Sequence, residues 1–589
     1  MRDQNVLILG LGASGLAMAR WCLRQGARVT VADTREAPPQ FAALAAQCPQ
    51  ATFVPGPFDN GLLSRCEWQL IARSPGLAPG SLQAVFDWAQ ARSVAVVGEL
   101  DLFAKALGEL AQRERLPYRP KVLAITGTNG KTTVTALTGL LLKRAGVNVA
   151  VAGNIGPALL DVLTSALDHE QVAQQTDDER TAADAAADSG ADVPPEASVV
   201  AAPLDDLVDG EPTDDAVPEA DGDEDGPTQL VPPPIEPPQP AHLPAVWVLE
   251  LSSFQLDGTA SGAWDRVPTA ATVLNLTEDH LDWHGDMAIY TRAKAAVFGA
   301  QALMLLNRDD PLVMALRPGM VTVKVGNRNR QQSARPWASF GFDLPTRAGD
   351  WGIETVNGMA WLVRALALDE TRKRGRGAEE EEEVYFQRLM PVDALRIRGR
   401  HNAANALAAL ALATSTGAAL GPMLHGLREY RGEPHRVEPV AIVDEVEYFD
   451  DSKGTNVGAT LAAVRGLGAE RRLVVILGGD GKGQDFSPLA QPLARHARAV
   501  VYIGRDAALL RSAVGAALDE SGTLQLEAAT LPEAVSLAAQ QARSGDAVLM
   551  SPACASLDMF DNYVHRARVF VDAVHALAHE QGVSLESGL

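Results

Sequence analysis

KVLAITGTNGKTT, residues Lys121 to Thr133, is the stretch that decides the fold. Residues 122–125 form an apolar run typical of a buried strand, and the residues after Lys131 predict a helix that ends at Gly146. Backbone N–H groups of the glycine turn, together with the positive end of that helix, can surround an anion. The stretch therefore predicts a strand, a phosphate loop and a helix in that order.

The loop residues match the chemistry of ATP. Lys131 is placed to reach the β- and γ-phosphates, and Thr132 to put its hydroxyl on Mg²⁺. Only two residues separate the two glycines of the turn, where the usual motif has four. A plain strand-to-helix turn with a surface lysine is the alternative. The predicted ATP-binding loop consists of Gly127, Thr128, Asn129, Gly130, Lys131, Thr132 and Thr133.

The charge of the chain is unevenly distributed. Its 589 residues indicate three or four domains, and its net charge is -23. Residues 168–242 hold 21 Asp and Glu against one Arg, so the remainder of the chain is nearly neutral. Affinity for anionic nucleotides must therefore come from local sites, and no nucleic-acid partner is expected.

Cysteine usage and hydropathy bear on the compartment. The four cysteines show no paired spacing, so neither a disulfide scaffold nor a zinc cluster is indicated. The chain starts directly with an apolar strand, and no uninterrupted apolar run reaches 18 residues. We expect a cytoplasmic protein without a membrane span.

Three folded units are expected, all of the α/β class. Residues 1–97 alternate strands with helices, residues 98–432 carry the phosphate loop, and residues 433–589 show further apolar strands separated by helices. Residues 168–243 are acidic, rich in Pro and Ala and almost free of aromatic residues, so we predict a disordered insertion in the central unit. A second charged stretch, 372–383, is expected to be a solvated loop or a hairpin extension.

A second glycine-rich turn lies at the N-terminus. Gly10, Gly12 and Gly15 form G-x-G-x-x-G directly after the first strand, and Asp33 ends the next strand. The pattern is typical of dinucleotide binding, which would make the protein a dehydrogenase. It fits equally well a site for another nucleotide diphosphate. The phosphate-loop lysine favours the second hypothesis, because a simple dehydrogenase has no use for it.

Polar residues follow two further strands of the central unit. Glu250 ends one strand, and Asp279 and His280 follow another. The carboxyl ends of parallel strands meet at one edge of a sheet, so these side chains are expected near the phosphate loop as a Mg²⁺ environment. His280 and His284 also have the i, i+4 spacing of a zinc pair on a helix, which stays open as an alternative.

Four more motifs carry polar side chains. Asn402 and Asn405 lie three residues apart at a helix start, where they could read an adenine edge. In the third unit polar turns occur at 451–456, 478–483 and 551–556, and their lysines and hydroxyls suit an acidic small molecule. Cys554 has no evident partner base, so we expect it to serve packing.

Taken together, these motifs resemble the Mur ligases of peptidoglycan precursor synthesis. The segments ITGTNGKTT, GNIG (153–156), LELSSFQL, NLTEDHLD, GRHNAAN and PHR (434–436) are similar to the superfamily, which includes the folate polyglutamating enzymes. DDSKGTN, GGDGKG and SPACASLDMF resemble its D-glutamate-adding branch. The resemblance implies three α/β domains: an N-terminal Rossmann-like uridine domain, a central domain with a phosphate-loop parallel sheet, and a C-terminal Rossmann-like domain.

The resemblance also implies a role for each matching residue. The UDP substrate is expected at Gly12, Ser14, Asp33, Thr34, Gly76, Asn154, Ser252 and Gln255. ATP is expected at the phosphate loop with Asn402, Asn405, Arg436 and Asp451. D-Glutamate is expected at Lys453, Thr455, Lys482, Ser556, Leu557 and Tyr563, where Tyr563 stands in place of a phenylalanine. Two Mg²⁺ ions are expected at Thr132, Glu250, His280 and Lys294, the last carrying a CO₂-derived carbamate.

The implied activity is ATP-dependent joining of D-glutamate to UDP-N-acetylmuramoyl-L-alanine by a monomeric enzyme, with Lys131, His280, Lys294 and Lys482 as the catalytic set. The carboxylate is first converted to an acyl phosphate, which the amine then attacks. Two alternatives stay open: another amino-acid ligase of the superfamily, and a nicotinamide-dependent oxidoreductase.

Overall fold

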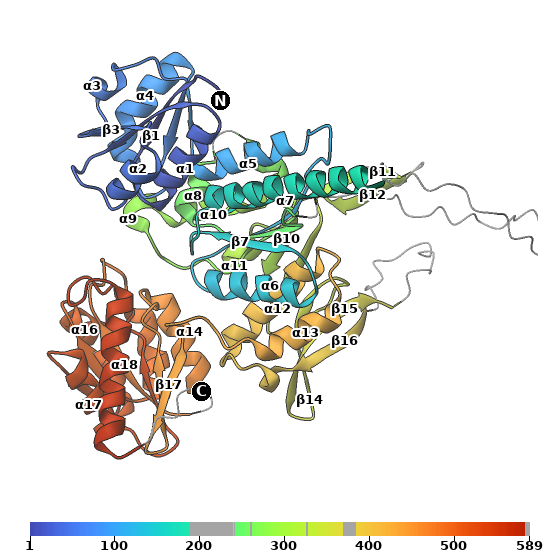
Figure 1. Ribbon diagram of the computed structural model, residues 1–589. Coiled ribbons are helices and arrows are strands. Elements are labelled where there is room, and N and C mark those ends of the chain that lie inside the picture. The colour runs from blue at the N-terminus through green and yellow to red at the C-terminus, as the bar shows by residue number, and fades with distance from the viewer. Residues whose placement is uncertain are drawn as a thin grey trace, which may run out of the picture.

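The computed structural model describes residues 1–188, 240, 242–259, 262–325, 328–368, 384–469 and 471–583. Three sheets, each flanked by helices, follow one another along the chain, which confirms the prediction of three α/β domains (Figure 1). Within these residues we find no helix with the length and apolar character that a bilayer crossing requires.

The N-terminal domain is a five-stranded parallel sheet in the order β3-β2-β1-β4-β5. This order matches the first five strands of the doubly wound order 3-2-1-4-5-6, in which ligands sit at the carboxyl edge where the strand order reverses. The strands are β1 (Asn5–Leu9), β2 (Arg28–Asp33), β3 (Thr52–Pro55), β4 (Leu70–Arg73) and β5 (Ala95–Val97). The helices are α1 (Ala13–Arg24), α2 (Phe41–Gln47), α3 (Asn60–Leu63) and α4 (Gln83–Arg92).

The central domain contains a nine-stranded sheet in the order β16-β15-β14-β13-β10-β9-β6-β8-β7. The seven strands from β14 to β7 are parallel, whereas β15 pairs antiparallel with both β14 and β16, which the sequence did not predict. Its strands are β6 (Lys121–Thr126), β7 (Val149–Gly153), β8 (Val246–Glu250), β9 (Ala270–Val273), β10 (Leu303–Asn307), β13 (Trp337–Phe340), β14 (Trp351–Val356), β15 (Met359–Ala367) and β16 (Val384–Pro391). The stretch 372–383 lies outside the described residues, between two strands that pair as in a hairpin.

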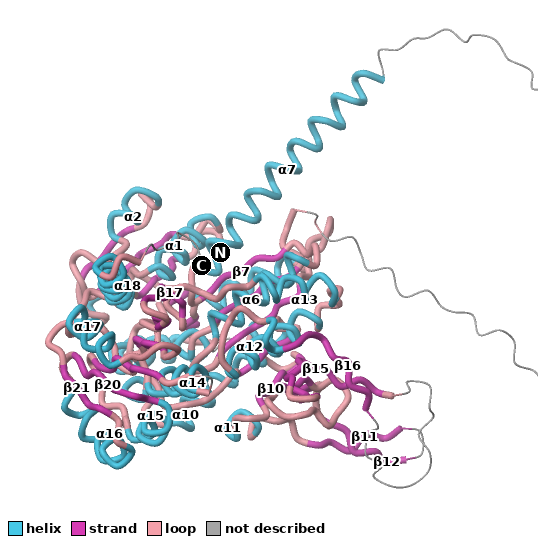
Figure 2. The backbone as a smooth tube through the Cα atoms, turned by 90° about the horizontal axis from the view of Figure 1, so that it is seen from below, coloured by secondary structure: helices cyan, strands magenta, loops and turns pink. Residues whose placement is uncertain are grey.

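Helices cover both faces of this central sheet, and a separate hairpin, β11 (Met320–Val325) with β12 (Arg328–Ser333), projects from it (Figure 2). The helix predicted after the phosphate loop is α6, and it ends at the expected place, just before Gly146. The helices are α5 (Glu99–Leu110), α6 (Lys131–Arg144), α7 (Leu159–Asp188), α8 (Ser253–Asp257), α9 (Leu281–His284), α10 (Met287–Ala295), α11 (Pro311–Met314), α12 (Arg400–Thr414) and α13 (Leu420–Glu429).

The predicted disorder of residues 168–243 is wrong for residues 168–188, which continue α7 as a helix. Residues 168–188 contain neither Gly nor Pro and are rich in Ala, Glu and Gln, which favour helix. The buried start of α7, at Leu159, Leu160 and Leu163, supplies the nucleus on which further turns can grow. Residues 189–239 of the predicted insertion lie outside the described residues.

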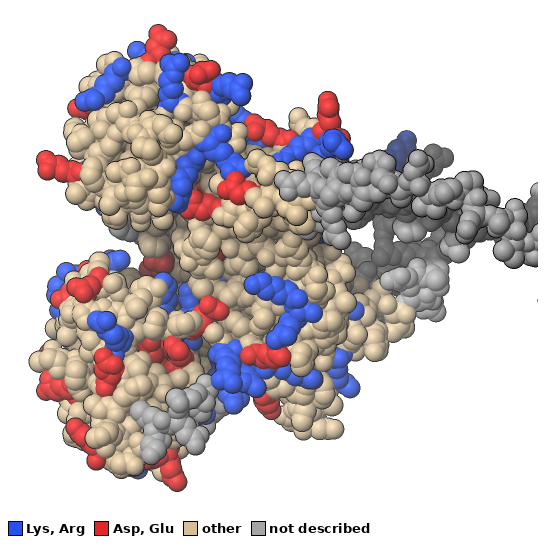
Figure 3. Space-filling model, in the orientation of Figure 1, with Lys and Arg blue, Asp and Glu red and all other residues tan. Residues whose placement is uncertain are grey.

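The C-terminal domain has a six-stranded sheet in the order β17-β18-β22-β19-β20-β21, parallel except for the β17–β18 pair. Its strands are β17 (Glu438–Val443), β18 (Val446–Asp450), β19 (Leu473–Gly478), β20 (Ala497–Ile503), β21 (Leu524–Glu527) and β22 (Ala547–Met550). Its helices are α14 (Val457–Gly468), α15 (Ala490–His496), α16 (Ala507–Ser521), α17 (Leu531–Gln541) and α18 (Tyr563–Glu580). A hollow separates this domain from the N-terminal domain on the face shown in Figure 3.

Candidate active site

The phosphate loop connects β6 to α6 at the carboxyl edge of the central sheet. Gly130, at the start of α6, has φ +82°, and a Cβ there would lie 2.8 Å from Asn405 Oδ1. Only glycine fits both the backbone conformation and the space. The Lys131 ammonium folds back and donates hydrogen bonds to the carbonyls of Gly127 (2.8 Å) and Thr128 (2.7 Å). The loop therefore holds its lysine in place before any phosphate arrives.

Two lysines meet at this loop in an unusual electrostatic setting. The Lys294 side chain is only 2% exposed, and its Nζ donates to the Gly127 carbonyl at 2.9 Å. Burial, reinforced by the nearby charge of Lys131, holds the pKa of Lys294 well below its usual range. Burial also lowers the pKa of Lys131, although Glu250 and Asp279 act in the opposite direction. Lys294 is consequently more often a neutral amine than an exposed lysine would be.

Glu250 ends β8 beside the loop and is 1% exposed. Its Oε1 accepts a hydrogen bond from Asn154 Nδ2 at 3.0 Å, whereas its Oε2 is buried without a hydrogen-bond partner among the described residues. A buried carboxylate oxygen without a partner is costly unless something else binds it. Carboxylate and hydroxyl oxygens are the ligands that Mg²⁺ prefers, so Glu250 and Thr132 fit a magnesium ion.

His280 lies at the start of α9 with φ 54°, and its ring packs 4.8 Å from that of Phe254. Its Nε2 is 3.6 Å from Asp279 Oδ2. His284 is buried, and its Nε2 lies within hydrogen-bond distance of Ser253 Oγ at 2.9 Å. In the described part of the chain, only His435, Glu438 and Asp450 bring three potential metal-binding side chains together, so the zinc pair of His280 and His284 is not supported.

The N-terminal glycine turn lets helix α1 lie close to the end of β1. A Cβ on Gly15 would lie 2.0 Å from the Gly10 carbonyl oxygen, so only glycine lets the helix pack against the turn. Asp33 is buried, accepts from Leu11 N at 2.7 Å and forms a two-point contact with the Arg35 guanidinium. The Arg35 hydrogen bond lowers the pKa of Asp33 to about 2.

The other predicted UDP residues lie around this turn or at the domain junction. Thr34 is exposed, and nothing lies within 4 Å of a Cβ built on Gly12 or Gly76. Ser252 caps α8 together with Gln255, so both side chains already serve the helix start. The backbone at Gly12 and Gly76 therefore has free space next to it, whereas Ser252 and Gln255 have a structural role.

The C-terminal domain touches the phosphate loop directly. Arg436 Nη2 donates to Thr132 Oγ1 at 2.6 Å. Asn129 and Asn456 exchange amide hydrogen bonds of 3.3 and 3.2 Å across the domain junction. The Thr132 hydroxyl, which was predicted to bind phosphate and metal, therefore accepts a hydrogen bond from Arg436 in this structure.

The residues predicted to bind adenine surround a small cavity at this junction. Asn405 Nδ2 donates to Asn402 Oδ1 at 3.0 Å, and Asn402 Nδ2 to the Arg398 carbonyl. The cavity has a volume of about 70 Å³ and is lined by both asparagines, Arg436 and Asp451. A whole nucleotide occupies several times this volume.

The three polar turns of the C-terminal domain come together at one sheet edge. Asp480 and Ala555 form a reciprocal backbone bridge, and Ser551 Oγ donates to Asp451 Oδ2 at 2.6 Å. Burial raises the pKa of Asp451 to about 7. This juxtaposition matches the expectation of one shared site for the turns.

The side chains predicted to bind D-glutamate differ in how far they are fixed. Lys453 Nζ lies 3.7 Å from the Tyr563 ring centroid, a cation–π contact. Lys482 is exposed and has φ 50°, and Leu557 is 67% exposed. Ser556 is buried, and Thr455 is half-buried. Cys554 is fully buried with a pKa raised to about 12, as expected for packing rather than nucleophilic chemistry.

Sequence reasoning missed three residues of this region. Tyr290 OH lies 3.1 Å from Thr128 Oγ1, Asn456 pairs with Asn129, and His435 Nδ1 lies 2.7 Å from Asp450 Oδ2. The sequence offered one signal for two of them: His435 adjoins Arg436 and Asp450 adjoins Asp451, and both neighbours were predicted to bind ATP. Tyr290 stands four residues before Lys294, one helical turn away on the same face.

Comparison with known proteins places this geometry in a family. Three family models match: the "Mur ligase MurD-like, N-terminal domain" at residues 4–98, the "Mur ligase middle domain" at 241–339, and the "Mur ligase, glutamate ligase domain" at 435–554. A UDP-N-acetylmuramoylalanine–D-glutamate ligase of Albidiferax ferrireducens is 53% identical over 100% of this chain and 99% of the relative. Proteins of the same description from Polaromonas sp. and Burkholderia vietnamiensis are 50% and 48% identical, with 98–100% of both chains covered.

Proposed function

The chain belongs to the Mur ligases, in the branch of the UDP-N-acetylmuramoylalanine–D-glutamate ligases, and we propose from that membership how its residues divide the work. The protein is an ATP-dependent, amide-forming ligase that adds D-glutamate to UDP-N-acetylmuramoyl-L-alanine in peptidoglycan precursor synthesis. The observation that carries this function is the 53% identity that extends over the whole chain. The phosphate loop and the third domain supply the chemistry that the reaction needs.

Each domain receives one substrate in this proposal. The N-terminal domain, residues 1–97, holds the uridine diphosphate, with the turn at Gly10–Gly15 facing the diphosphate and Asp33 with Thr34 at its edge. The central domain, residues 98–432, holds ATP on the phosphate loop. The C-terminal domain, residues 433–589, holds D-glutamate between the turns that contain Lys453, Lys482 and Ser556.

The first half of the reaction makes the carboxylate reactive. An oxygen of the alanine carboxylate attacks the γ-phosphorus of ATP, and the bond from that phosphorus to the β-γ bridging oxygen breaks, which yields an acyl phosphate and ADP. Phosphoryl transfer depends on positioning and charge neutralisation. Lys131 supplies a cation on the phosphates after its ammonium leaves the Gly127 and Thr128 carbonyls.

The second half forms the amide. The amine of D-glutamate attacks the acyl carbon, and the tetrahedral adduct expels phosphate as the amine loses its proton. The developing oxyanion needs positive charge or hydrogen-bond donors close by. His280 lies at the edge of the loop next to Asp279, where it can orient groups around this adduct.

Two groups beyond the polypeptide fit the site. Glu250 Oε2 and the Thr132 hydroxyl are suited to hold Mg²⁺, which, when bound, neutralises phosphate charge. The depressed pKa of Lys294 favours the neutral amine that CO₂ requires for carbamate formation. A carbamate on Lys294 would give this buried side chain a negative charge toward the metal ions. The hydrogen bond of 2.9 Å from Lys294 Nζ to the Gly127 carbonyl supports this proposal, because it keeps the side chain beside the loop.

The alternatives lose support on specific grounds. A nicotinamide-dependent oxidoreductase has no need for the phosphate loop with its two lysines. A folate-type ligase does not need the N-terminal glycine turn, which is fully formed here. We place the enzyme in the cytoplasm as a monomer, in line with four cysteines that are all free thiols.

Phosphate release tests the proposed function. The purified protein is incubated with ATP, Mg²⁺ and UDP-N-acetylmuramoyl-L-alanine, together with D-glutamate, L-glutamate, meso-diaminopimelate or L-lysine in separate reactions. Sustained phosphate release is expected with D-glutamate alone. Release with another amino acid and not with D-glutamate would reassign the substrate, and reduction of a nicotinamide cofactor, followed at 340 nm, would reassign the enzyme class.

A further inference from the structure

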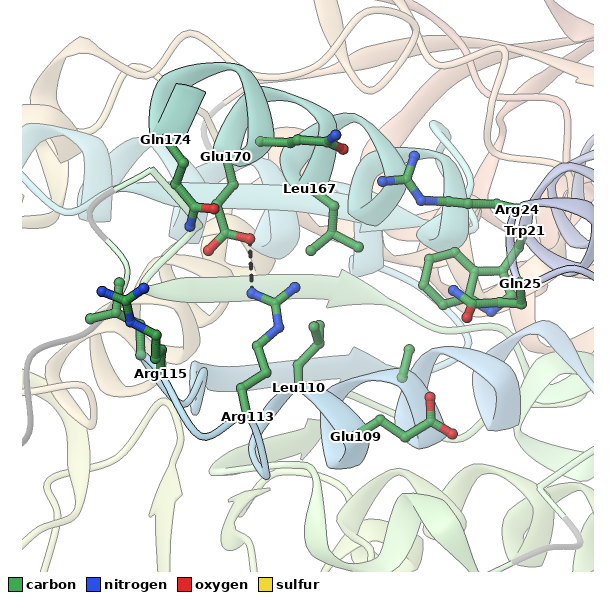
Figure 4. A pocket seen from close by; sticks show the side chains of 13 residues that line it. Trp21, Arg24, Gln25, Glu109, Leu110, Arg113, Arg115, Leu167, Glu170 and Gln174 are labelled. Atoms are coloured by element: carbon green, nitrogen blue, oxygen red, sulfur yellow. Dashed lines mark hydrogen bonds and ion pairs between the residues drawn. The ribbon is translucent and has the colours of Figure 1, made fainter. Parts of the chain in front are cut away.

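A large cavity lies away from the reaction site, between α1, α5 and α7 (Figure 4). Its volume is about 1110 Å³, at the upper end of the range for small-molecule sites. Helix α1 connects the N-terminal glycine turn with this cavity. The glycine turn lies at the start of the helix, and its last residue, Arg24, lines the cavity. Twelve helical residues separate them by about 18 Å.

The middle of the cavity is apolar. Leu167 of α7 points toward Leu110 of α5 across the space, and Trp21 of α1 closes one end (Figure 4). All three side chains are mostly buried and belong to the same hydrophobic cluster. A ligand with a flat or apolar body would gain from contact with them, at about 25 cal/mol for each Å² removed from water.

One buried carboxylate in the wall of this cavity has an oxygen that accepts no hydrogen bond from the described residues. Glu170 of α7 is 4% exposed, and its Oε2 accepts a hydrogen bond from Arg113 Nη1 at 2.9 Å. Its Oε1 is buried and has no hydrogen-bond partner within the part of the chain that the structure describes. An oxygen in this position is stabilised by a ligand that donates an N–H or O–H.

The rim of the cavity is cationic. Arg24, Arg113 and Arg115 line it together with the carboxylates Glu109 and Glu170. Arg24 is paired with Asp168 and Arg113 with Glu170, which leaves the guanidinium of Arg115 to meet a ligand. Arg115 is exposed at the end opposite to Trp21 (Figure 4). Guanidinium groups bind carboxylates, phosphates and sulfonates through paired hydrogen bonds.

From these three features we propose that the cavity is a second small-molecule site, which takes an amphipathic organic anion that also carries an N–H or O–H donor. The apolar body lies between Leu110, Leu167 and Trp21, the donor meets Glu170 Oε1, and the acidic group meets Arg115. Trp21 and Arg24 come from the N-terminal domain, and the remaining walls from the central domain. Occupation of the site therefore ties together the two domains between which the UDP substrate binds.

The test uses 8-anilinonaphthalene-1-sulfonate, which combines an aromatic body, one N–H donor and one sulfonate. We expect its fluorescence to rise saturably with the full-length protein, and the signal to persist when ADP and uridine monophosphate occupy the reaction site. N-Phenyl-1-naphthylamine has the same rings and N–H without the sulfonate, and it should bind at least tenfold more weakly. Equal binding of both probes, or displacement of the sulfonate by the nucleotides, would overturn the proposal.

Two variants locate the probe. Leu167→Trp fills the cavity and should weaken binding of the sulfonate at least tenfold, whereas Val172→Trp, on an exposed position of the same helix, should leave it unchanged. Arg115→Glu alters only an exposed rim residue and should weaken binding about tenfold, and Arg65→Glu, exposed elsewhere, serves as the matched charge control. Equal affinity in Arg115→Glu and Arg65→Glu would contradict the proposed anion contact even if Leu167→Trp failed to fold.

Discussion

The two lysines at the phosphate loop are held more firmly than the two lysines proposed to bind D-glutamate. Lys131 and Lys294 lie at the phosphate loop, both donate to the Gly127 carbonyl, and burial lowers the pKa of each. Lys453 and Lys482 lie in the C-terminal domain, where one rests on the Tyr563 ring and the other extends into solvent. The lysines at the phosphate loop are thus held by buried contacts, whereas the lysines proposed to bind D-glutamate are only partly fixed.

The comparison predicts the largest effect at Lys131. Replacement by alanine removes the cation on the phosphates, so phosphate release from ATP should fall about 100- to 1,000-fold. Binding of the UDP substrate, measured by calorimetry, should change little because Lys131 is not among the residues proposed to contact it. Lys143→Ala, an exposed lysine at the end of the same helix, is the control. Wild-type turnover in Lys131→Ala would exclude the assigned role of the loop.

Lys294→Ala should lower turnover about 10- to 100-fold, as expected for a group that acts on the metal environment. If the wild-type side chain is a carbamate, added formate or acetate should restore part of the activity of the variant. Mass spectrometry under CO₂ should also detect the adduct on the wild-type protein. A variant that no short carboxylate rescues would leave Lys294 a structural lysine.

Lys482→Ala should raise the KM for D-glutamate about tenfold, which corresponds to about 1.4 kcal/mol, and change the KM for ATP by less than about twofold. The effect is smaller because an exposed ammonium is already screened by water. Steady-state kinetics with each substrate varied in turn provides the measurement. Equal shifts in both constants would argue against a site built by the C-terminal turns.

Asp451 is expected to affect stability rather than turnover. Burial raises its pKa from 3.8 to about 7, so the native carboxyl binds a proton that the unfolded chain has already released. Its contribution to the free energy of unfolding is complete below about pH 4 and is lost as the pH rises through 7, at no more than about 1.4 kcal/mol per unit. Urea unfolding of the nucleotide-free protein at pH 5 and pH 7.5 should show this loss, and Asp451→Asn should not. Identical pH dependence of the two proteins would contradict the shift.

The sequence predicted the three α/β domains because its strongest signals are local. A glycine turn after an apolar strand specifies backbone geometry within a dozen residues, as at Gly130, and strand ends such as Glu250 then converge through sheet topology. The antiparallel strands β14 to β16 were missed because short alternating strands carry weak signals.

Contacts between domains could not be predicted in this way. The pairing of Asn129 with Asn456 joins residues 327 positions apart, and neither motif indicates its partner. The helical state of residues 168–188 was also missed, because composition was weighed over the whole acidic segment rather than over its Gly- and Pro-free start. The first feature depends on packing between domains, and the second depends on cooperative growth of a helix from its buried start. Neither can be read from the local sequence alone.

The length of α7 affects how the size of the molecule will be measured. Its 30 residues form a rod of about 45 Å, and Figure 2 shows its second half standing clear of the three domains. A projecting rod increases hydrodynamic drag more than it increases mass, so the protein should elute early from a gel-filtration column, at the volume of a heavier globular particle. Light scattering, which reports mass without reference to shape, should return a value near 62.3 kDa for the single chain.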